Sequence, residues 1–210
     1  MADPLLNLGD FLKSHRLPGS FADVANNYYV PLADWLLGRI EKSTRRTFVL
    51  GINGAQGTGK TTLSNFLAGY LRDAHDLSVA ELSIDDIYLT RAERRELAER
   101  VHPLLATRGV PGTHDVALGK SVIARLCGLQ AGETLPLPRF DKSRDDRCPA
   151  GDWPEVAGPL DLVIFEGWCV GSTAQQAEDI VTPVNRLEAD EDGDCAWRSY
   201  VNEQLARVYG

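Results

Sequence analysis

The sequence predicts an α/β fold in which a mostly parallel sheet is flanked by helices. Short runs at 47–52, 79–84 and 160–165 have the composition of strands, and the first is nearly all apolar, as in strands buried on both faces. Residues 59–75 place apolar side chains at spacings of three and four, which indicates a helix. Strands and helices alternate along the chain, which favours parallel pairing because parallel strands need a crossover between them.

The remaining elements follow from the same patterns. Residues 1–46 show apolar residues at helical spacing and are predicted to form a helical extension packed on the core domain, 47–210. Further helices are expected at 91–101, 116–126 and 196–209. The sequence shows no internal repeat, and no linker divides the core domain into two parts.

Three other stretches are expected to be exposed. The helix at 91–101 is highly charged and is expected to form a solvated face. The segment 128–159 is rich in Gly, Pro and Asp, which is typical of a long functional loop. Five of the seven residues from 188 to 194 are acidic, so we expect a solvated loop there.

The charge and the cysteines limit the function classes. With 22 Lys and Arg against 30 Asp and Glu, the formal net charge is −8, which argues against broad nucleic-acid binding. No export signal and no apolar run of membrane-spanning length is present. The four cysteines, at 127, 148, 169 and 195, form no CxxC pair, so free thiols are expected. We therefore expect a cytoplasmic protein that acts on a small molecule, as a monomer or weak dimer.

The segment 54–61 matches the pattern GxxxxGK[ST] between a predicted strand and a predicted helix. Glycines allow the backbone N–H groups to approach phosphate oxygens, and the helix directs its positive end at the anion. Lys60 is expected to reach the β- and γ-phosphates and Thr61 to ligate Mg²⁺. The predicted phosphate-binding residues are Gly54, Ala55, Gln56, Gly57, Thr58, Gly59, Lys60, Thr61 and Thr62.

Carboxylates follow two of the predicted strands. Asp85 and Asp86 come directly after the second strand, where ligands bind in open α/β sheets. Asp85 is predicted to accept the proton of an attacking hydroxyl, and Asp86 to support it or to ligate the metal; the alternative is a helix or turn cap. Glu166, at the end of the third strand, is expected to bind the metal or its water, or to be structural. Trp168 is either a wall of the acceptor site or a core residue.

Two polar loops, 108–115 and 138–147, are candidates to bind an anionic acceptor. The first combines Gly and Pro with charged groups, and the second carries four cationic side chains. Such cations stabilise the charge of a transferring phosphoryl group. The alternative is a pair of surface turns with solvated ion pairs, which contribute little energy. His114 alone fits either a structural hydrogen bond or a contact to substrate.

Four ordered blocks within Gly51–Gly171 carry a resemblance to a known family: GINGAQGTGKTT, SIDDIYLT, RGVPGTHD with PRFDKSRDDR, and EGWCVG. The chain resembles the glycerate 3-kinase-like branch of the P-loop kinases, which is related to the phosphoribulokinase, uridine kinase and pantothenate kinase group. The resemblance implies that Asp85 is the general base and that His114 and Lys142 lie in segments lining the acceptor pocket. We assign catalysis to Asp85, Lys60 and Arg108, the metal to Thr61, Glu166 and Asp86, and the acceptor to Tyr88, His114, Asp115, Lys142, Arg147 and Trp168.

The implied reaction is ATP- and Mg²⁺-dependent phosphoryl transfer to a small hydroxy acid, with D-glycerate giving 3-phosphoglycerate as the first expectation. Kinases of this kind continue beyond the position of Gly210, so we expect C-terminal elements of the fold to be missing. One alternative is another acceptor, such as a nucleoside, a pantothenate-like alcohol or a sugar acid. The other is a nucleotide-dependent switch ATPase in which hydrolysis drives a partner.

Overall fold

A computed structural model describes residues 8–209 and divides them into two compact units. The first unit contains the chain up to Leu82 together with 123–135 and 155–168. The second contains 83–122, 136–154 and the residues from Cys169 onward. Each unit is assembled from three separate stretches of chain, so no linker marks the division in the sequence.

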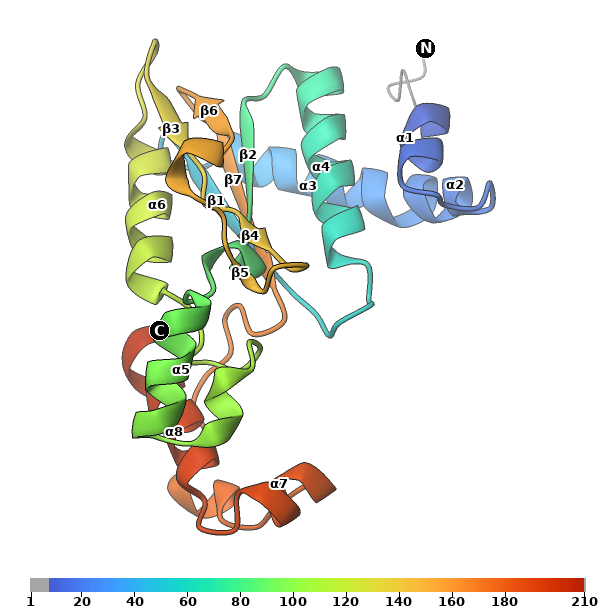
Figure 1. Cartoon of the computed structure of the whole chain (residues 1–210). Coiled ribbons are helices and arrows are strands. Elements are labelled where there is room, and N and C mark those ends of the chain that lie inside the picture. Colours follow the sequence, from blue (N-terminus) through green and yellow to red (C-terminus); the bar gives the residue numbers. More distant parts are fainter. Residues whose placement is uncertain (1–7, 210) are drawn as a thin grey trace. The chain divides into compact units, whose positions relative to one another are not determined.

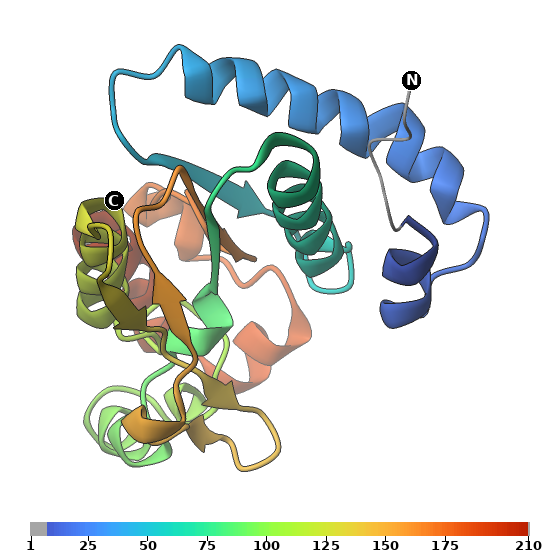
Figure 2. The ribbon, with the colours of Figure 1, turned by 90° about the horizontal axis from the view of Figure 1, so that it is seen from above.

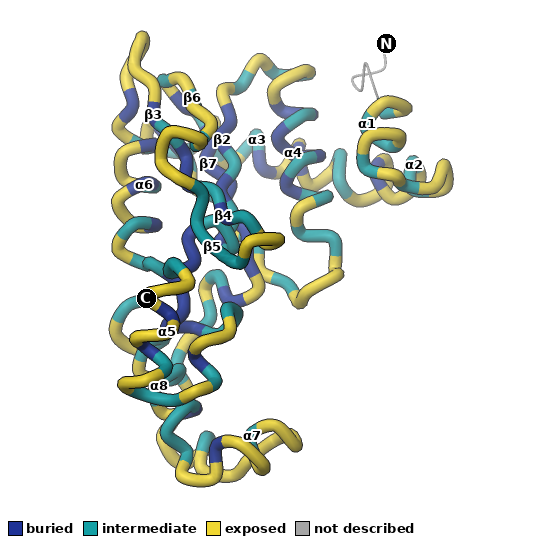
Figure 3. Tube along the Cα trace, in the orientation of Figure 1, coloured by how far each residue is buried: buried dark blue, intermediate teal, exposed yellow. Residues whose placement is uncertain are grey.

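A three-stranded sheet forms the centre of the first unit. Its strands are β1 (Phe48–Asn53), β7 (Leu162–Gly167) and β2 (Val79–Ser83), in the order β1-β7-β2. Strand β1 runs parallel to β7, with Phe48 opposite Leu162 and Asn53 opposite Gly167. Strand β7 is buried along nearly its whole length (Figure 3). The predicted α/β fold with parallel strands and flanking helices is confirmed.

Helices pack on this sheet through one hydrophobic core. Helix α4 (Lys60–His75) contacts β1 and β7. Before the sheet come α1 (Leu8–Ser14), α2 (Phe21–Val24), a π-helical turn (Ala25–Tyr29) and α3 (Val30–Glu41). The run from α2 to α3 is continuous and its α3 part lies across α4 (Figure 2).

The ring of Phe66 in α4 lies at the centre of this helical packing. It is in edge contact with Phe11 and Tyr29, at centroid distances of 5.5 and 5.3 Å, and stacks with Tyr70 at 6.0 Å. Ala25, Ala33 and Leu36 join the same buried cluster as Leu162 and Ile164 of β7. From residue 8 onward, the N-terminal segment is therefore helical and shares the core of the sheet.

The segment 128–159, expected to be a loop, contains four short strands. Strands β3 (Thr134–Pro136) and β6 (Glu155–Ala157) form one two-stranded sheet. Strands β4 (Phe140–Asp141) and β5 (Asp146–Arg147) form an antiparallel hairpin in the second unit, with Phe140 opposite Arg147. The prediction of an irregular loop is wrong for these positions, because strands of two or three residues carry no visible periodicity.

The second unit is mostly helical (Figure 1). Its longer helices are α5 (Arg91–Arg100), the start of α6 (Val116–Gly128), α7 (Arg186–Glu191) and α8 (Ala196–Gln204), which runs into a π-helical turn (Leu205–Tyr209). Single 3₁₀ turns lie at Ile84–Ile87, Pro103–Ala106, Ala150–Asp152 and Ala177–Ile180. The expected helices at 91–101, 116–126 and 196–209 are confirmed.

Two expectations about exposed charge hold only in part. Helix α5 is not only a solvated face, because Arg94 is fully buried and Leu97 nearly so. The acidic stretch 188–194 is not a solvated loop: α7 covers its first half and Asp192 is fully buried. In both places an oppositely charged residue pairs with the buried group: Asp145, 51 positions away, with Arg94, and Arg198, six positions away, with Asp192.

Two further expectations concern the thiols and the membrane. All four cysteines are free thiols, as predicted. Among residues 8–209, none of the helices combines the length and the apolar character needed to cross a bilayer.

Candidate active site

The loop between β1 and α4 is shaped by glycines. Gly57 and Gly59 have φ values of +79° and +87°, in the left-handed region that other residues adopt only at a cost. Gly59 is also the N-cap residue of α4, which begins at Lys60. Backbone N–H groups at such a helix start bind anions through their partial positive charge. The strand–loop–helix arrangement predicted from the sequence is therefore present.

The loop also closes on itself through side chains. A Cβ at Gly54 would lie 2.8 Å from Thr58 Oγ1, so only glycine fits there. The Thr58 hydroxyl donates to the Ala55 carbonyl at 2.7 Å, and Lys60 Nζ donates to the same oxygen at 3.2 Å. Lys60 is thus held over the loop by a single bond to a neutral oxygen, which a phosphate oxygen can replace.

Two of the three predicted metal ligands meet in the first unit. The Thr61 hydroxyl, in the first turn of α4, donates to Glu166 Oε1 at 3.1 Å. Glu166 lies in β7 and is buried, with 7% of its surface exposed. Hydroxyl and carboxylate oxygens are the donor set that Mg²⁺ prefers in nucleotide sites. The donor set at Thr61 and Glu166 therefore fits the metal.

Asp85 lies in the second unit, in the 3₁₀ turn that follows β2. Its backbone N–H donates to the Ser83 hydroxyl at 3.2 Å, which caps the turn. Lys142 Nζ donates to Asp85 Oδ2 at 2.7 Å, and the Tyr88 hydroxyl lies within electrostatic reach of the same carboxylate. Burial, followed by the charge of Asp85, raises the pKa of the Tyr88 hydroxyl, which therefore stays protonated. Three predicted site residues are brought together here.

Asp86 faces a different partner. Its carboxylate accepts a hydrogen bond from Arg139 Nη1 at 2.9 Å and one from the Phe140 backbone N–H at 3.4 Å. Burial raises its pKa, against the opposing effect of the Arg139 charge. Through these contacts the Asp86 carboxylate connects the 3₁₀ turn Ile84–Ile87 to the segment at β4, which is a structural role. Its role as a metal ligand stays a prediction.

Tyr88, His114, Asp115 and Arg147 form one connected group. The guanidinium of Arg147 donates to the Tyr88 carbonyl at 2.8 Å and to Asp115 Oδ2 at 3.2 Å. The His114 ring stacks on the Tyr88 ring, with centroids 4.4 Å apart and planes inclined by 21°. Asp115 Oδ1 accepts from the Leu118 N–H and so caps the start of α6. The predicted acceptor residues of the second unit therefore lie together around Asp85 and Tyr88.

The partner of His114 is a residue that no sequence motif predicts. The His114 Nδ1 atom lies 2.6 Å from the hydroxyl of Tyr209, which also accepts from the Gly112 N–H at 2.9 Å. Burial lowers the pKa of His114 to about 4, so its ring is neutral at neutral pH. The two residues are 95 positions apart, and no motif connects them.

Arg108, predicted to be catalytic, is held by a cluster that the sequence did not reveal. It forms an ion pair with Asp145, whose other oxygen accepts from the buried Arg94 at 2.7 Å. Both guanidinium groups also lie 5.6 Å from the centroid of the Phe140 ring. Asp145 thus neutralises a buried cation and orients Arg108 at the same time.

Trp168 follows β7 in the first unit and keeps 39% of its surface exposed. This exposure is incompatible with a fully buried core position. A role as a wall of the acceptor site stays a prediction.

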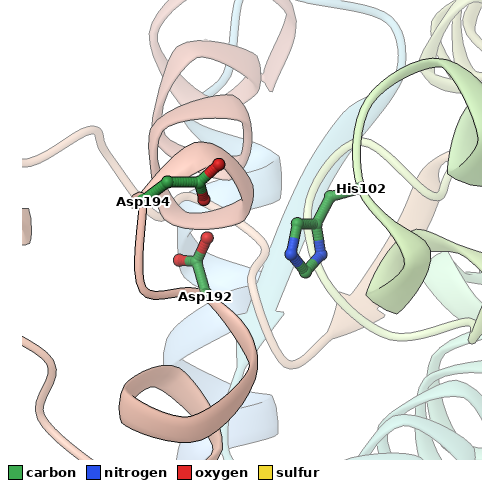
Figure 4. Close-up of side chains that lie close together, drawn as sticks. All are labelled: His102, Asp192 and Asp194. Atoms are coloured by element: carbon green, nitrogen blue, oxygen red, sulfur yellow. The ribbon is translucent and has the colours of Figure 1, made fainter.

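Figure 4 shows His102 opposite Asp192 and Asp194, a grouping compatible in distance with a metal site. Each of the three side chains already takes part in hydrogen bonds within the protein. His102 Nδ1 accepts from the Leu104 N–H, and Nε2 lies 3.0 Å from the Glu191 carbonyl, to which it donates. Both Asp192 oxygens accept from the start of α8, including Arg198 Nε at 2.8 Å. We interpret this cluster as a structural ion pair.

Comparison of the sequence with known proteins identifies kinases as relatives. No family model matches the chain. The chain is 34% identical over 199 residues to the chloroplastic D-glycerate 3-kinase of Arabidopsis thaliana, covering 84% of this chain and 42% of that protein. It is 40% identical over 152 residues to the uncharacterized kinase mug58 of Schizosaccharomyces pombe, covering 67% of this chain and 53% of that protein. The chain thus spans about half the length of the curated relatives it matches.

Solved structures agree with these relatives. A D-glycerate 3-kinase from Cryptococcus neoformans superposes with a TM-score of 0.71 at 28% identity, covering 84% of this chain and 67% of that one. The YGR205w protein superposes with a TM-score of 0.59 at 28% identity, covering 87% of this chain and 63% of that one.

Proposed function

We propose that this chain transfers the γ-phosphoryl group of ATP to a hydroxyl of a small hydroxy acid. By sequence and by fold it belongs to the glycerate 3-kinase-like P-loop kinases. The first choice of acceptor is D-glycerate, with 3-phosphoglycerate as the product. The observation that carries the proposal is the glycine-shaped loop with Lys60 above it and the Thr61–Glu166 pair beside it.

In this proposal the first unit binds the nucleotide. The loop N–H groups and the Lys60 ammonium hold the β- and γ-phosphate oxygens and stabilise the negative charge that shifts to the leaving ADP. Thr61 and Glu166 would hold Mg²⁺, directly or through water. Bound there, the ion would supply positive charge that shields the phosphate oxygens.

The second unit supplies the base and the groups that bind the acceptor. As the acceptor hydroxyl oxygen forms its bond to the γ-phosphorus, its proton passes to the Asp85 carboxylate, and the bond to the bridging oxygen of ADP breaks. Lys142, which pairs with Asp85 at 2.7 Å, and Arg147, which pairs with Asp115 at 3.2 Å, are the cations we assign to a substrate carboxylate. Arg108 is held by Asp145 and adds positive charge for the transferring group.

Three broader expectations belong to the same proposal. The four free thiols fit a reducing compartment such as the cytoplasm. The net charge of −8 disfavours a nucleic-acid partner. We propose that the protein acts as a monomer or weak dimer, which light scattering of the purified chain measures.

The deciding experiment measures ADP release with Mg²⁺ and a panel of acceptors: D-glycerate, L-glycerate, a nucleoside, pantothenate and no acceptor. We expect release only with ATP and a hydroxy acid, most with D-glycerate, and loss of release when Mg²⁺ is chelated. Release by another acceptor alone contradicts the choice of D-glycerate. Steady release without any acceptor contradicts the kinase proposal and supports a switch ATPase.

Lys60→Ala is the matching variant of the nucleotide site. Removing one charge-stabilising donor costs about a hundredfold to a thousandfold in rate. We expect that loss in the ADP assay with an unchanged thermal unfolding midpoint. Lys42→Ala, which removes an exposed lysine at the end of α3, is the control and should keep full activity. Equal activity of the two variants contradicts the role of Lys60.

A further inference from the structure

The ring of His114 carries a buried polar atom with no partner. His114 is 5% exposed, and among the described residues its Nε2 atom has no hydrogen-bond partner, although its other ring nitrogen does. An unsatisfied donor or acceptor in a buried position costs about 1 to 3 kcal/mol. Other buried atoms among residues 8–209 also have no partner, such as Trp197 Nε1, but His114 Nε2 belongs to the group around Asp85 and Tyr88, where a bound acceptor could supply one.

The hydrogen bonds of Tyr209 decide which form of the ring is present. Its oxygen accepts from the Gly112 N–H at 2.9 Å, and its own proton has one neighbouring acceptor among the described residues, His114 Nδ1 at 2.6 Å. When the hydroxyl donates to Nδ1, the proton of the neutral ring lies on Nε2 and a single group is left unpaired. The opposite tautomer leaves two groups unpaired, the hydroxyl proton and the Nε2 lone pair.

We propose that Tyr209 is a positioning residue of the acceptor site, which holds His114 as the tautomer protonated on Nε2 so that this N–H donates to an acidic oxygen of the acceptor. The inference rests on the proposed function for the identity of the acceptor, but the tautomer follows from the chain alone. A neutral donor is suited to this place because burial keeps the ring uncharged.

The same contacts connect Tyr209 to the catalytic base. The His114 ring stacks on Tyr88, and the charge of Asp85 contributes, after burial, to the raised pKa of the Tyr88 hydroxyl. Tyr209 also holds the loop before His114 through Gly112, whose φ of +97° allows the close approach of the last helix. A Cβ at Gly112 would lie 2.5 Å from Tyr200, so only glycine fits between the loop and α8.

The tautomer is measured directly by ¹⁵N NMR of the full chain labelled at histidine. The chain has four histidines, and the His114 signals are assigned by their loss in His114→Gln. We expect an unprotonated Nδ1 and a protonated Nε2 at neutral pH. A protonated Nδ1 in the unaltered chain overturns the inference without any variant.

Two variants separate the hydroxyl of Tyr209 from the packing of its ring. Tyr209→Phe should convert the His114 signals to a mixture of tautomers and raise KM for the acceptor roughly tenfold, with KM for ATP unchanged. Tyr200→Phe is the matched control on the same helical run, since none of the described residues is seen to bond its hydroxyl, and it should change neither quantity. Unchanged His114 signals in Tyr209→Phe overturn the positioning role.

The acceptor half has its own readout. Adding D-glycerate and ADP to the unaltered chain should shift the Nε2–H signal, whereas ADP alone should not. If no hydroxy acid that supports ADP release shifts this signal, the donor role of Nε2 is wrong while the kinase proposal stands. If the signal shifts but no acceptor supports ADP release, the site binds hydroxy acids and the kinase proposal fails.

Discussion

The phosphate loop and the acceptor group are built in opposite ways. In residues 54–61, conformation is set within a few positions, by positive φ angles at Gly57 and Gly59 and by bonds to the carbonyl of Ala55. In the acceptor group, each functional side chain is held by a residue far away in sequence. Asp85 pairs with Lys142, Arg108 with Asp145, and His114 with Tyr209.

The difference explains what each region tolerates. A loop whose shape depends on backbone angles is sensitive to the loss of a glycine, whereas its side chains act almost independently. A group held by ion pairs and buried hydrogen bonds is coupled, because removing one partner leaves the other buried without compensation. The following changes test this contrast, from the largest expected effect to the smallest.

Asp85→Asn removes the proposed base while keeping the size of the side chain. We expect the rate of ADP release with acceptor to fall by roughly a hundredfold to ten-thousandfold, because general base catalysis supplies about that much. Nucleotide affinity, measured by fluorescent ADP displacement, should not change, since the loop forms without Asp85.

Asp152→Asn is the control for that variant, because Asp152 is an exposed aspartate in the same unit. Its rate should equal that of the unaltered chain. A fall in both rate and nucleotide affinity in Asp85→Asn would show that the two regions are not independent, which contradicts the contrast drawn above.

Asp145→Asn tests the coupling inside the second unit. The change leaves the Arg94 guanidinium fully buried without its anion, and breaking a buried ion pair costs about 3 to 5 kcal/mol. We expect a loss of about 3 kcal/mol in the free energy of unfolding, measured by urea titration. The backbone is not the cause, since Asn accepts the φ of +55° found here.

An unchanged free energy of unfolding in Asp145→Asn would show that water or another group compensates Arg94. Asp152→Asn again serves as the control and should stay within about 0.5 kcal/mol of the unaltered chain.

This difference between the phosphate loop and the acceptor group also explains which parts of the structure could be predicted from the sequence. The three core strands, the main helices and the phosphate loop follow from periodicity and from one local motif, and the structure confirms them, whereas the strand order was not predicted. Sequence blocks around Asp85, His114 and Arg147 predicted the acceptor group, but not the contacts that hold it. Arg94 belongs to a helix whose high charge predicts a solvated face, and Tyr209 lies in no motif.

Such partners depend on tertiary packing, in which the pairing of two residues is decided by how distant segments meet. Arg94 lies three residues before Leu97 and so on the same buried face of α5, but this spacing does not identify Asp145 as its partner. The short strands β4 and β5 were missed for the same reason, because two residues on each side are held by pairing and not by propensity.

His114 gives the second unit a pH dependence. Burial lowers its pKa to about 4 in the folded chain, against about 6.5 when unfolded, so the unfolded state binds more protons between these values. This contribution to stability is complete above pH 6.5 and is lost as the pH falls toward 4, by about 3 kcal/mol in total.

The measurement compares urea unfolding of the unaltered chain and of His114→Gln from pH 7 to pH 4. Both lose stability from carboxylates such as Asp145, whose pKa its arginine partners lower. Only the unaltered chain should carry the additional slope, so parallel curves would contradict a buried, neutral His114.

Gly57→Ala is expected to have the smallest effect and to act on the loop alone. A Cβ at Gly57 would meet nothing within 4 Å, so the cost comes only from the φ of +79°, about 1 to 2 kcal/mol. Because the exposed loop relaxes when empty and must regain this shape to bind phosphate, the cost should reduce ADP affinity roughly tenfold and leave the unfolding free energy nearly unchanged.

Gly151→Ala, at an exposed glycine with equal space, is the control and should change neither quantity. A stability loss without an affinity loss in Gly57→Ala would mean that the loop keeps its shape when empty, and the region encoded most locally would then also be the more rigid of the two.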